Sequence, residues 1–79
     1  MIINKEQLEV GLKFYNRTKS HLGIIDKVNS ASVDYTWYKA ENNEFNNIAN
    51  LDTKQFIKYF EENTFLLKEI PINNLYPIY

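Results

Sequence analysis

The chain has no cysteine, one histidine, and only two glycines and two prolines among its 79 residues. The absence of cysteine excludes a disulfide framework, a thiolate zinc site and a cysteine nucleophile. Two isolated glycines, Gly11 and Gly23, cannot form a glycine-rich phosphate-binding loop. Because small secreted domains usually depend on disulfides, we expect this protein to be cytoplasmic.

Long apolar runs and a strong excess of one charge are also missing. The net charge is −1, and no apolar stretch approaches the roughly 20 residues that a membrane span requires. Charged residues begin at Lys5, too early for a secretory signal peptide. A nucleic-acid-binding protein normally carries a basic surface, so the charge balance disfavours that class. We therefore expect a single domain without a membrane segment.

The sequence offers few groups for catalysis. His21 is the single histidine, and the acidic residues lack the spacing of a calcium loop or a metal site. As a general base, His21 would need a nucleophile and charge-stabilising groups converging on it in a pocket. The alternative is a histidine on a strand edge that faces water beside Lys19. We expect a protein that is not an enzyme and binds no metal or cofactor.

Aromatic residues make up 15% of the chain, and all hydrophobic residues together, aromatic ones included, make up 44%. Alternation of apolar and polar residues predicts strands over 10–15, 21–28, 33–38, 45–49 and 64–67. In the first strand, Val10, Leu12 and Phe14 are expected to face the core. A bulge near Ile25 and Asp26 is expected to bring Ile25 and Val28 to one side.

In the strand over 33–38, the pattern predicts that Val33, Tyr35 and Trp37 face the core. A helix is expected to follow Asp52, whose side chain is a good N-cap. Its inward positions are Phe56, Ile57 and Phe60, which recur at helical spacing. We expect the helix to end near Asn63, because asparagine readily adopts the left-handed backbone conformation that ends helices.

These elements predict a mainly β domain over residues 1–67, with one helix before the last strand. We expect a small SH3-like antiparallel sheet or barrel of about five strands that curls on itself. Residues 68–79 form an apolar C-terminal tail containing both prolines. We expect this tail to pack either on the domain or on a partner.

Four groups of core positions support this fold by resemblance. They are Leu8-x-x-Gly11-x-x-Phe14, Ile25-Asp26-Lys27-Val28, Val33-Asp34-Tyr35-x-Trp37 and Phe56-x-x-x-Phe60. Their order over residues 6–67 resembles small uncharacterised SH3-like barrel proteins of phages and mobile elements. The resemblance implies a role as a protein or nucleic-acid adaptor, and some small phage proteins inhibit host complexes. It implies no catalytic residue.

The leading expectation is a protein-interaction module, in a specific form a phage-encoded inhibitor of a host complex. Tyrosine offers a large contact area at low entropic cost. The expected contact residues are Tyr15, Tyr38, Tyr76, Ile78 and Tyr79. The alternative for the tyrosines is that the tail or the helix covers them.

Two other functions fit the pattern. Basic residues around the first hairpin could follow the phosphates of a single-stranded nucleic acid while Tyr15 stacks on a base. These residues are Lys13, Arg17, Lys19 and Lys27, which otherwise form an ordinary solvated hairpin. Alternatively, the chain assembles into a homo-oligomer through its tail or an open sheet edge.

Overall fold

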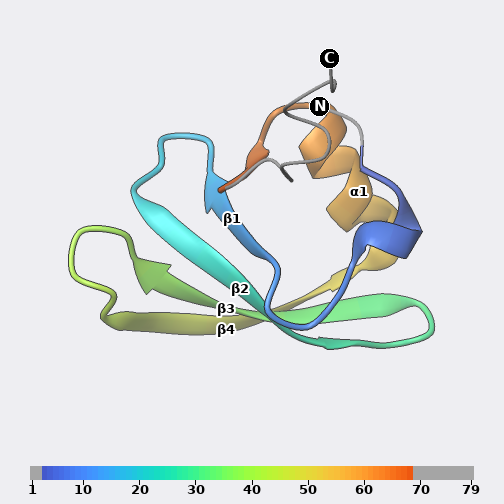
Figure 1. Cartoon of the computed structure of the whole chain (residues 1–79), viewed down its shortest axis with the longest axis horizontal. Helices are drawn as coiled ribbons and strands as arrows, with labels where there is room; N and C mark the ends of the chain where they lie inside the picture. The colour runs from blue at the N-terminus through green and yellow to red at the C-terminus, as the bar shows by residue number, and fades with distance from the viewer. Residues whose placement is uncertain (1–2, 69–79) are drawn as a thin grey trace, which may run out of the picture.

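The structure is a computed structural model, and it describes residues 3–68. It contains five strands, a nine-residue helix and one turn of 3-10 helix (Figure 1). In chain order the elements are η1 (Lys5–Gln7), β1 (Lys13–Asn16), β2 (His21–Val28), β3 (Ser32–Lys39), β4 (Phe45–Asp52), α1 (Thr53–Glu61) and β5 (Phe65–Leu67). The predicted mainly β fold, with one helix before the last strand, is confirmed.

All neighbouring strands are antiparallel, and the sheet order is β4-β3-β2-β1-β5. Figure 1 shows β1 and β5 rising from the plane of β2–β4, with α1 on the same side. Within residues 3–68, β4 and β5 are the two edges and do not pair, so the sheet is open. Closure into a barrel fails because β4 runs directly into α1 and β5 has only three residues.

The core is centred on the ring of Phe14, which is completely buried. Its centroid lies 5.2 Å from that of Phe56 and 4.9 Å from that of Phe65. Tyr35 and Phe60 lie at 5.4 and 5.7 Å. The contacts therefore come from β3, α1 and β5, and most are edge-to-face arrangements that aromatic rings favour. One side chain thus joins the sheet to the helix.

The segment before β1 differs from its prediction at Val10. Leu8 is buried as expected, but Val10 is 67% exposed and β1 begins only at Lys13. The reason is a turn at Gly11, whose φ of +93° lies in the region that favours glycine. Leu12 comes after this turn and is half-buried against the core.

The bulge and the helix boundaries agree with the sequence pattern. The pairing of β2 with β3 shifts register between Ile25 and Lys27. The Asp52 carboxylate accepts hydrogen bonds from the backbone N–H groups of Lys54 and Gln55, at 3.0 and 3.4 Å. Asn63 follows the helix with a φ of +62°.

The predicted core face is confirmed apart from the degree of burial at two positions. Val33, Tyr35, Phe56 and Phe60 are buried, whereas Trp37 and Ile57 are half-buried against the core. The predicted tail residues Tyr76, Ile78 and Tyr79 lie outside the described residues. No helix in the described part is long and apolar enough to cross a membrane.

Candidate functional site

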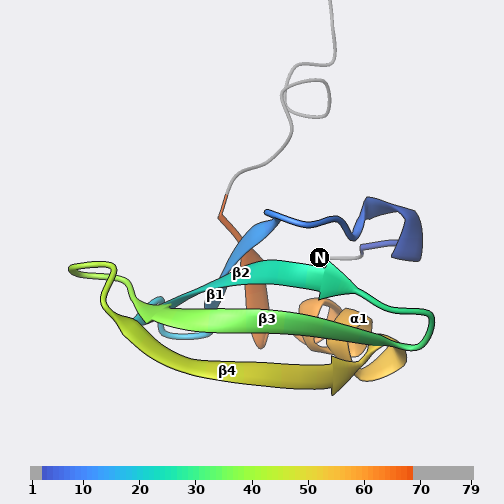
Figure 2. The same cartoon turned by 90° about the horizontal axis from the view of Figure 1, so that it is seen from below.

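The sheet has one face that contributes to the core and one that does not. Successive residues of a strand point to opposite faces, so Phe14 and Trp37 on the core face leave Tyr15 and Tyr38 on the other. In Figure 2 the strands β2–β4 lie in front of α1, so the helix packs on the far face of the sheet in this view. We call the face opposite α1 the second face.

Apolar side chains form a continuous line across the second face. Strand pairing places Leu66 opposite Tyr15, and Tyr15 opposite Leu22. Leu22 is opposite Tyr38, which in turn is opposite Phe45. Directly opposed side chains in antiparallel strands lie close enough to pack together. These five residues, one from each strand, form what we call the apolar row.

Burial along the apolar row is uneven. Leu22, at its centre, is only 8% exposed although it is not part of the main core cluster. Tyr15 and Tyr38 on either side of it are half-buried. Phe45, at the β4 end, is 61% exposed. The row therefore packs against itself and still presents aromatic surface to solvent.

A second line of residues widens this apolar surface. Ile24 of β2 lies opposite both Lys13 and Thr36, and Thr36 lies opposite Ile48. Ile48 is 70% exposed, the most exposed large apolar side chain among residues 3–68. A shallow depression of about 240 Å³ is lined by Lys13, Leu22, Ile24, Tyr38 and Asn43. The depression therefore combines apolar side chains with one lysine and one asparagine.

The other end of the second face is polar. Asp34 accepts hydrogen bonds from the side-chain amides of Asn50 and Asn29, the latter at 3.3 Å. These bonds, with a smaller contribution from the charge of Lys27, lower the pKa of Asp34 below its ordinary value of 3.8. Asp34 is therefore an anion at neutral pH, and Lys27 lies opposite it on β2, so the second face changes from apolar to charged along the strands.

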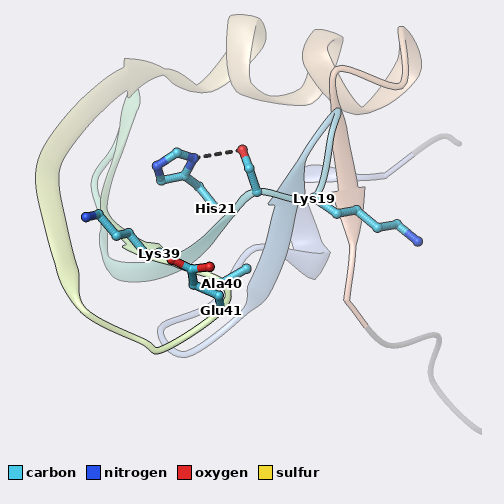
Figure 3. A pocket seen from close by; sticks show the side chains of 6 residues that line it. Lys19, His21, Lys39, Ala40 and Glu41 are labelled. Carbon is cyan, nitrogen blue, oxygen red and sulfur yellow. Dashed lines mark hydrogen bonds between the residues drawn. The ribbon is translucent and has the colours of Figure 1, made fainter.

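His21 lies at a separate depression of about 510 Å³ (Figure 3). Its Nδ1 is 2.9 Å from the Ser20 hydroxyl oxygen. That hydroxyl also accepts a hydrogen bond from the Asn16 amide, at 2.9 Å, and lies 3.0 Å from the Thr18 hydroxyl. These contacts stabilise the turn between β1 and β2. The Ser20 hydroxyl is thus part of the hydrogen bonding within this turn.

The cations at this depression do not converge. Figure 3 shows the side chains of Lys19 and Lys39 pointing to opposite sides, and Glu41 also lines the depression. An anion-binding site needs donors aimed at one position. The arrangement is therefore that of a solvated hairpin end with mixed charge.

Trp37 and amide side chains line a smaller depression next to His21. Its volume is about 260 Å³, and Asn16, Asn46 and Asn47 complete the lining. The rings of His21 and Trp37 are 6.5 Å apart and nearly perpendicular, at 80°. Trp37 is half-buried, so part of this residue is exposed at the depression.

The basic residues expected to act together are dispersed. Arg17 and Lys19 lie in the turn between β1 and β2, whereas Lys13 lies on the second face. Lys27 is near the far end of β2, opposite Asp34. Lys39, which the sequence analysis did not select, lies opposite His21 and near Lys19.

The two predicted contact tyrosines are brought together, but their neighbours were missed. Leu22, Phe45 and Leu66 complete the apolar row although none was selected from the sequence. The available signal was alternation, which places Leu22 and Ile24 on the face opposite Ile25.

Among residues 3–68, no three histidine, cysteine or acidic side chains come together as a metal site. Comparisons with family models, curated proteins and solved structures found no match. The resemblance to SH3-like barrel proteins therefore remains a prediction.

Proposed function

We propose that this protein is a non-enzymatic protein-interaction module and that the apolar row is its contact surface. The supporting observation is that one apolar side chain from every strand lies on the second face. The helix contributes its buried residues Phe56 and Phe60 to the other side of the sheet. The second face is thus not what joins the sheet to α1.

The composition of the row suits protein binding. Interface centres are enriched in aromatic residues and depleted of charge, and their rims are polar. Tyr15, Tyr38 and Phe45 supply the aromatic part, and the charged residues Lys13 and Asp34 lie beyond the same side of the row, on β1 and β3. A partner with an apolar strip and charged groups along one side of that strip fits this arrangement.

Substitution within the apolar row is expected to abolish partner binding. Phe45→Glu places a charge at a 61% exposed position at one end of the row, and Tyr15→Ser removes a ring on the other side of Leu22. Each variant should retain less than a tenth of the partner captured from lysate by the immobilised wild-type protein, measured by quantitative mass spectrometry. The matched control is Val10→Glu, which changes a similarly exposed apolar residue outside the strands, in the turn before β1.

Equal capture by wild type, Phe45→Glu and Tyr15→Ser would contradict the proposal. The proposed contact surface also includes Tyr76, Ile78 and Tyr79 of the tail. A chain ending at Lys68 tests this part, because it should fold and bind more weakly. The finer hypothesis, a phage-encoded inhibitor, requires that the captured complex loses activity when the protein is added.

Single-stranded nucleic-acid binding is the second candidate. It is favoured by Trp37, which lines one depression beside His21, while Lys19 and Lys39 line the other depression that His21 borders. Base stacking on an aromatic ring combined with phosphate contacts is how such proteins bind without sequence preference. The surface differs from the one inferred from sequence, because Lys13 and Lys27 lie elsewhere.

Salt dependence separates the two functions. If three phosphates are neutralised, affinity for a labelled oligonucleotide should fall about 20-fold between 50 and 200 mM salt. Replacing Arg17, Lys19 and Lys39 by alanine should flatten that dependence, whereas Lys27→Ala should not. Filter binding measures both effects, and the absence of binding at low salt would exclude this candidate.

A further inference from the structure

The strand β4 forms one edge of the sheet, and its outer backbone groups can be assigned. The N–H of Thr53 donates to the carbonyl of Ala31 at 3.0 Å, which fixes the alternation of hydrogen bonds between β3 and β4. Every second residue before Thr53 therefore directs its backbone N–H and C=O groups toward β3. These residues are Leu51, Ala49 and Asn47. Ile48 and Asn50 therefore direct theirs outward, away from the sheet.

A side-chain contact agrees with this assignment. The carbonyl of Ile48 accepts a hydrogen bond from the Asn47 side-chain amide, at 3.4 Å. An outward carbonyl is the one that a side chain at the edge can reach. At 3.4 Å the contact is long, so an incoming strand can replace it with a shorter bond.

Within residues 3–68, the edge lacks the usual protection against pairing with another strand. Natural edge strands carry lysine, proline or inward-pointing charge, or they are very short. From Phe45 to Leu51, β4 contains no charged residue and no proline, and the strand is eight residues long. The register shift between Trp37 and Tyr38 leaves Asn46 without a partner on β3. Regular pairing is thus available over residues 47–52.

We propose that the occupant of this edge is a second copy of the chain, paired β4 to β4 in antiparallel orientation about a twofold axis at Ala49. In this register Ile48 lies opposite Asn50 of the second copy, and Asn50 opposite Ile48. Both outward positions of each strand are then hydrogen-bonded. A register shifted by two residues would use Asn46, at the bulge, or Asp52, which caps α1.

Self-association is supported by charge and by side-chain placement. Because the paired segment is uncharged and the net charge is −1, two copies do not repel each other strongly. The two Ile48 side chains become diagonal neighbours on the second face, within packing reach. The opposite face brings two small Ala49 side chains together, which permits close approach.

The dimer is expected to be weak. A single pair of edge strands buries less area than the roughly 1,200 Å² of a stable interface. It extends the open sheet across both copies and places two apolar rows on one continuous surface. The inference uses the edge of β4, so it goes beyond the proposed function and is tested separately.

Cysteine cross-linking tests the register, because the natural chain contains no cysteine. Ala49→Cys places two thiols at a directly opposed, non-hydrogen-bonded pair, about 4.5 Å apart at Cα, a separation that a disulfide can bridge. Asn47→Cys is the matched control on the same side of the same strand. Its Cα atoms would be about 14 Å apart along the strands.

Under mild oxidation at about 0.5 mM protein, a concentration suited to a weak interface, Ala49→Cys is expected to give at least ten times more covalent dimer than Asn47→Cys. Equal cross-linking of the two variants would overturn the proposal. So would a wild-type chain that sediments as a monomer at the same concentration.

Proline substitution provides an independent test. Ile48→Pro removes an N–H that points away from β3, a position where an edge strand tolerates proline. It should weaken dimerisation at least tenfold in sedimentation relative to Ile48→Thr, which keeps the N–H. Circular dichroism identifies a folded Ile48→Pro variant, and equal dimerisation of both folded variants would overturn the proposal.

Discussion

Phe14→Ala is expected to lower the free energy of unfolding by about 3–5 kcal/mol. Phe14 is completely buried, and its ring contacts β3, α1 and β5 at once. A domain of this size is stabilised by only about 5–15 kcal/mol in total. Urea denaturation followed by tryptophan fluorescence measures the loss, since Trp37 lies 5.3 Å from the Phe14 ring.

The same substitution at Phe45 is the control. Phe45 lies in the same sheet but is 61% exposed, so Phe45→Ala should change stability by no more than about 0.5 kcal/mol. A similar loss at both positions would contradict a core centred on Phe14. The comparison also shows whether variants in the apolar row remain folded, which the binding experiment requires.

Gly23→Ala is expected to destabilise the fold by about 1–3 kcal/mol through overpacking. A Cβ atom at Gly23 would lie 2.5 Å from Cζ of Phe14 and 2.7 Å from its Cε2. The ring cannot move aside, because Phe56, Phe60 and Phe65 surround it. The measurement is again the unfolding free energy in urea.

A double substitution tests the cause. Phe14→Leu shortens the side chain that meets the new methyl group, so the combined loss should be smaller than the sum by about 0.5–3 kcal/mol. The control is Gly11→Ala, where no atom lies within 4 Å of the added Cβ but φ is +93°. Its loss comes from backbone strain, so Phe14→Leu should not relieve it. Simple additivity at Gly23 would exclude the clash.

The sequence predicted elements best where the hydrophobic pattern was regular. The alternation through Val33, Tyr35 and Trp37 corresponds to β3, and the N-cap at Asp52 corresponds to the start of α1. The prediction for Val10 was wrong because Gly11 reverses the chain, and alternation alone does not reveal a turn. The strand over 45–49 extends to Asp52, where asparagine and aspartate give little indication of a strand.

The candidate site was only partly predictable. Alternation assigned Tyr15 and Tyr38 to outward faces, because that property depends on each strand alone. Their relation through Leu22 depends on the pairing register, which is set by turns and by the bulge at Ile25. The dispersal of the basic residues has the same cause, since a long β2 carries Lys27 away from the first turn.

The pairing of β1 with β5 has a consequence for synthesis on the ribosome. Tyr15 lies near the beginning of the sheet and its neighbour Leu66 near the end of the described chain. Phe65 packs on Phe14, so this ring stays incompletely enclosed until translation has passed the helix. We therefore expect the domain to complete its core late in synthesis, when this non-local pairing forms.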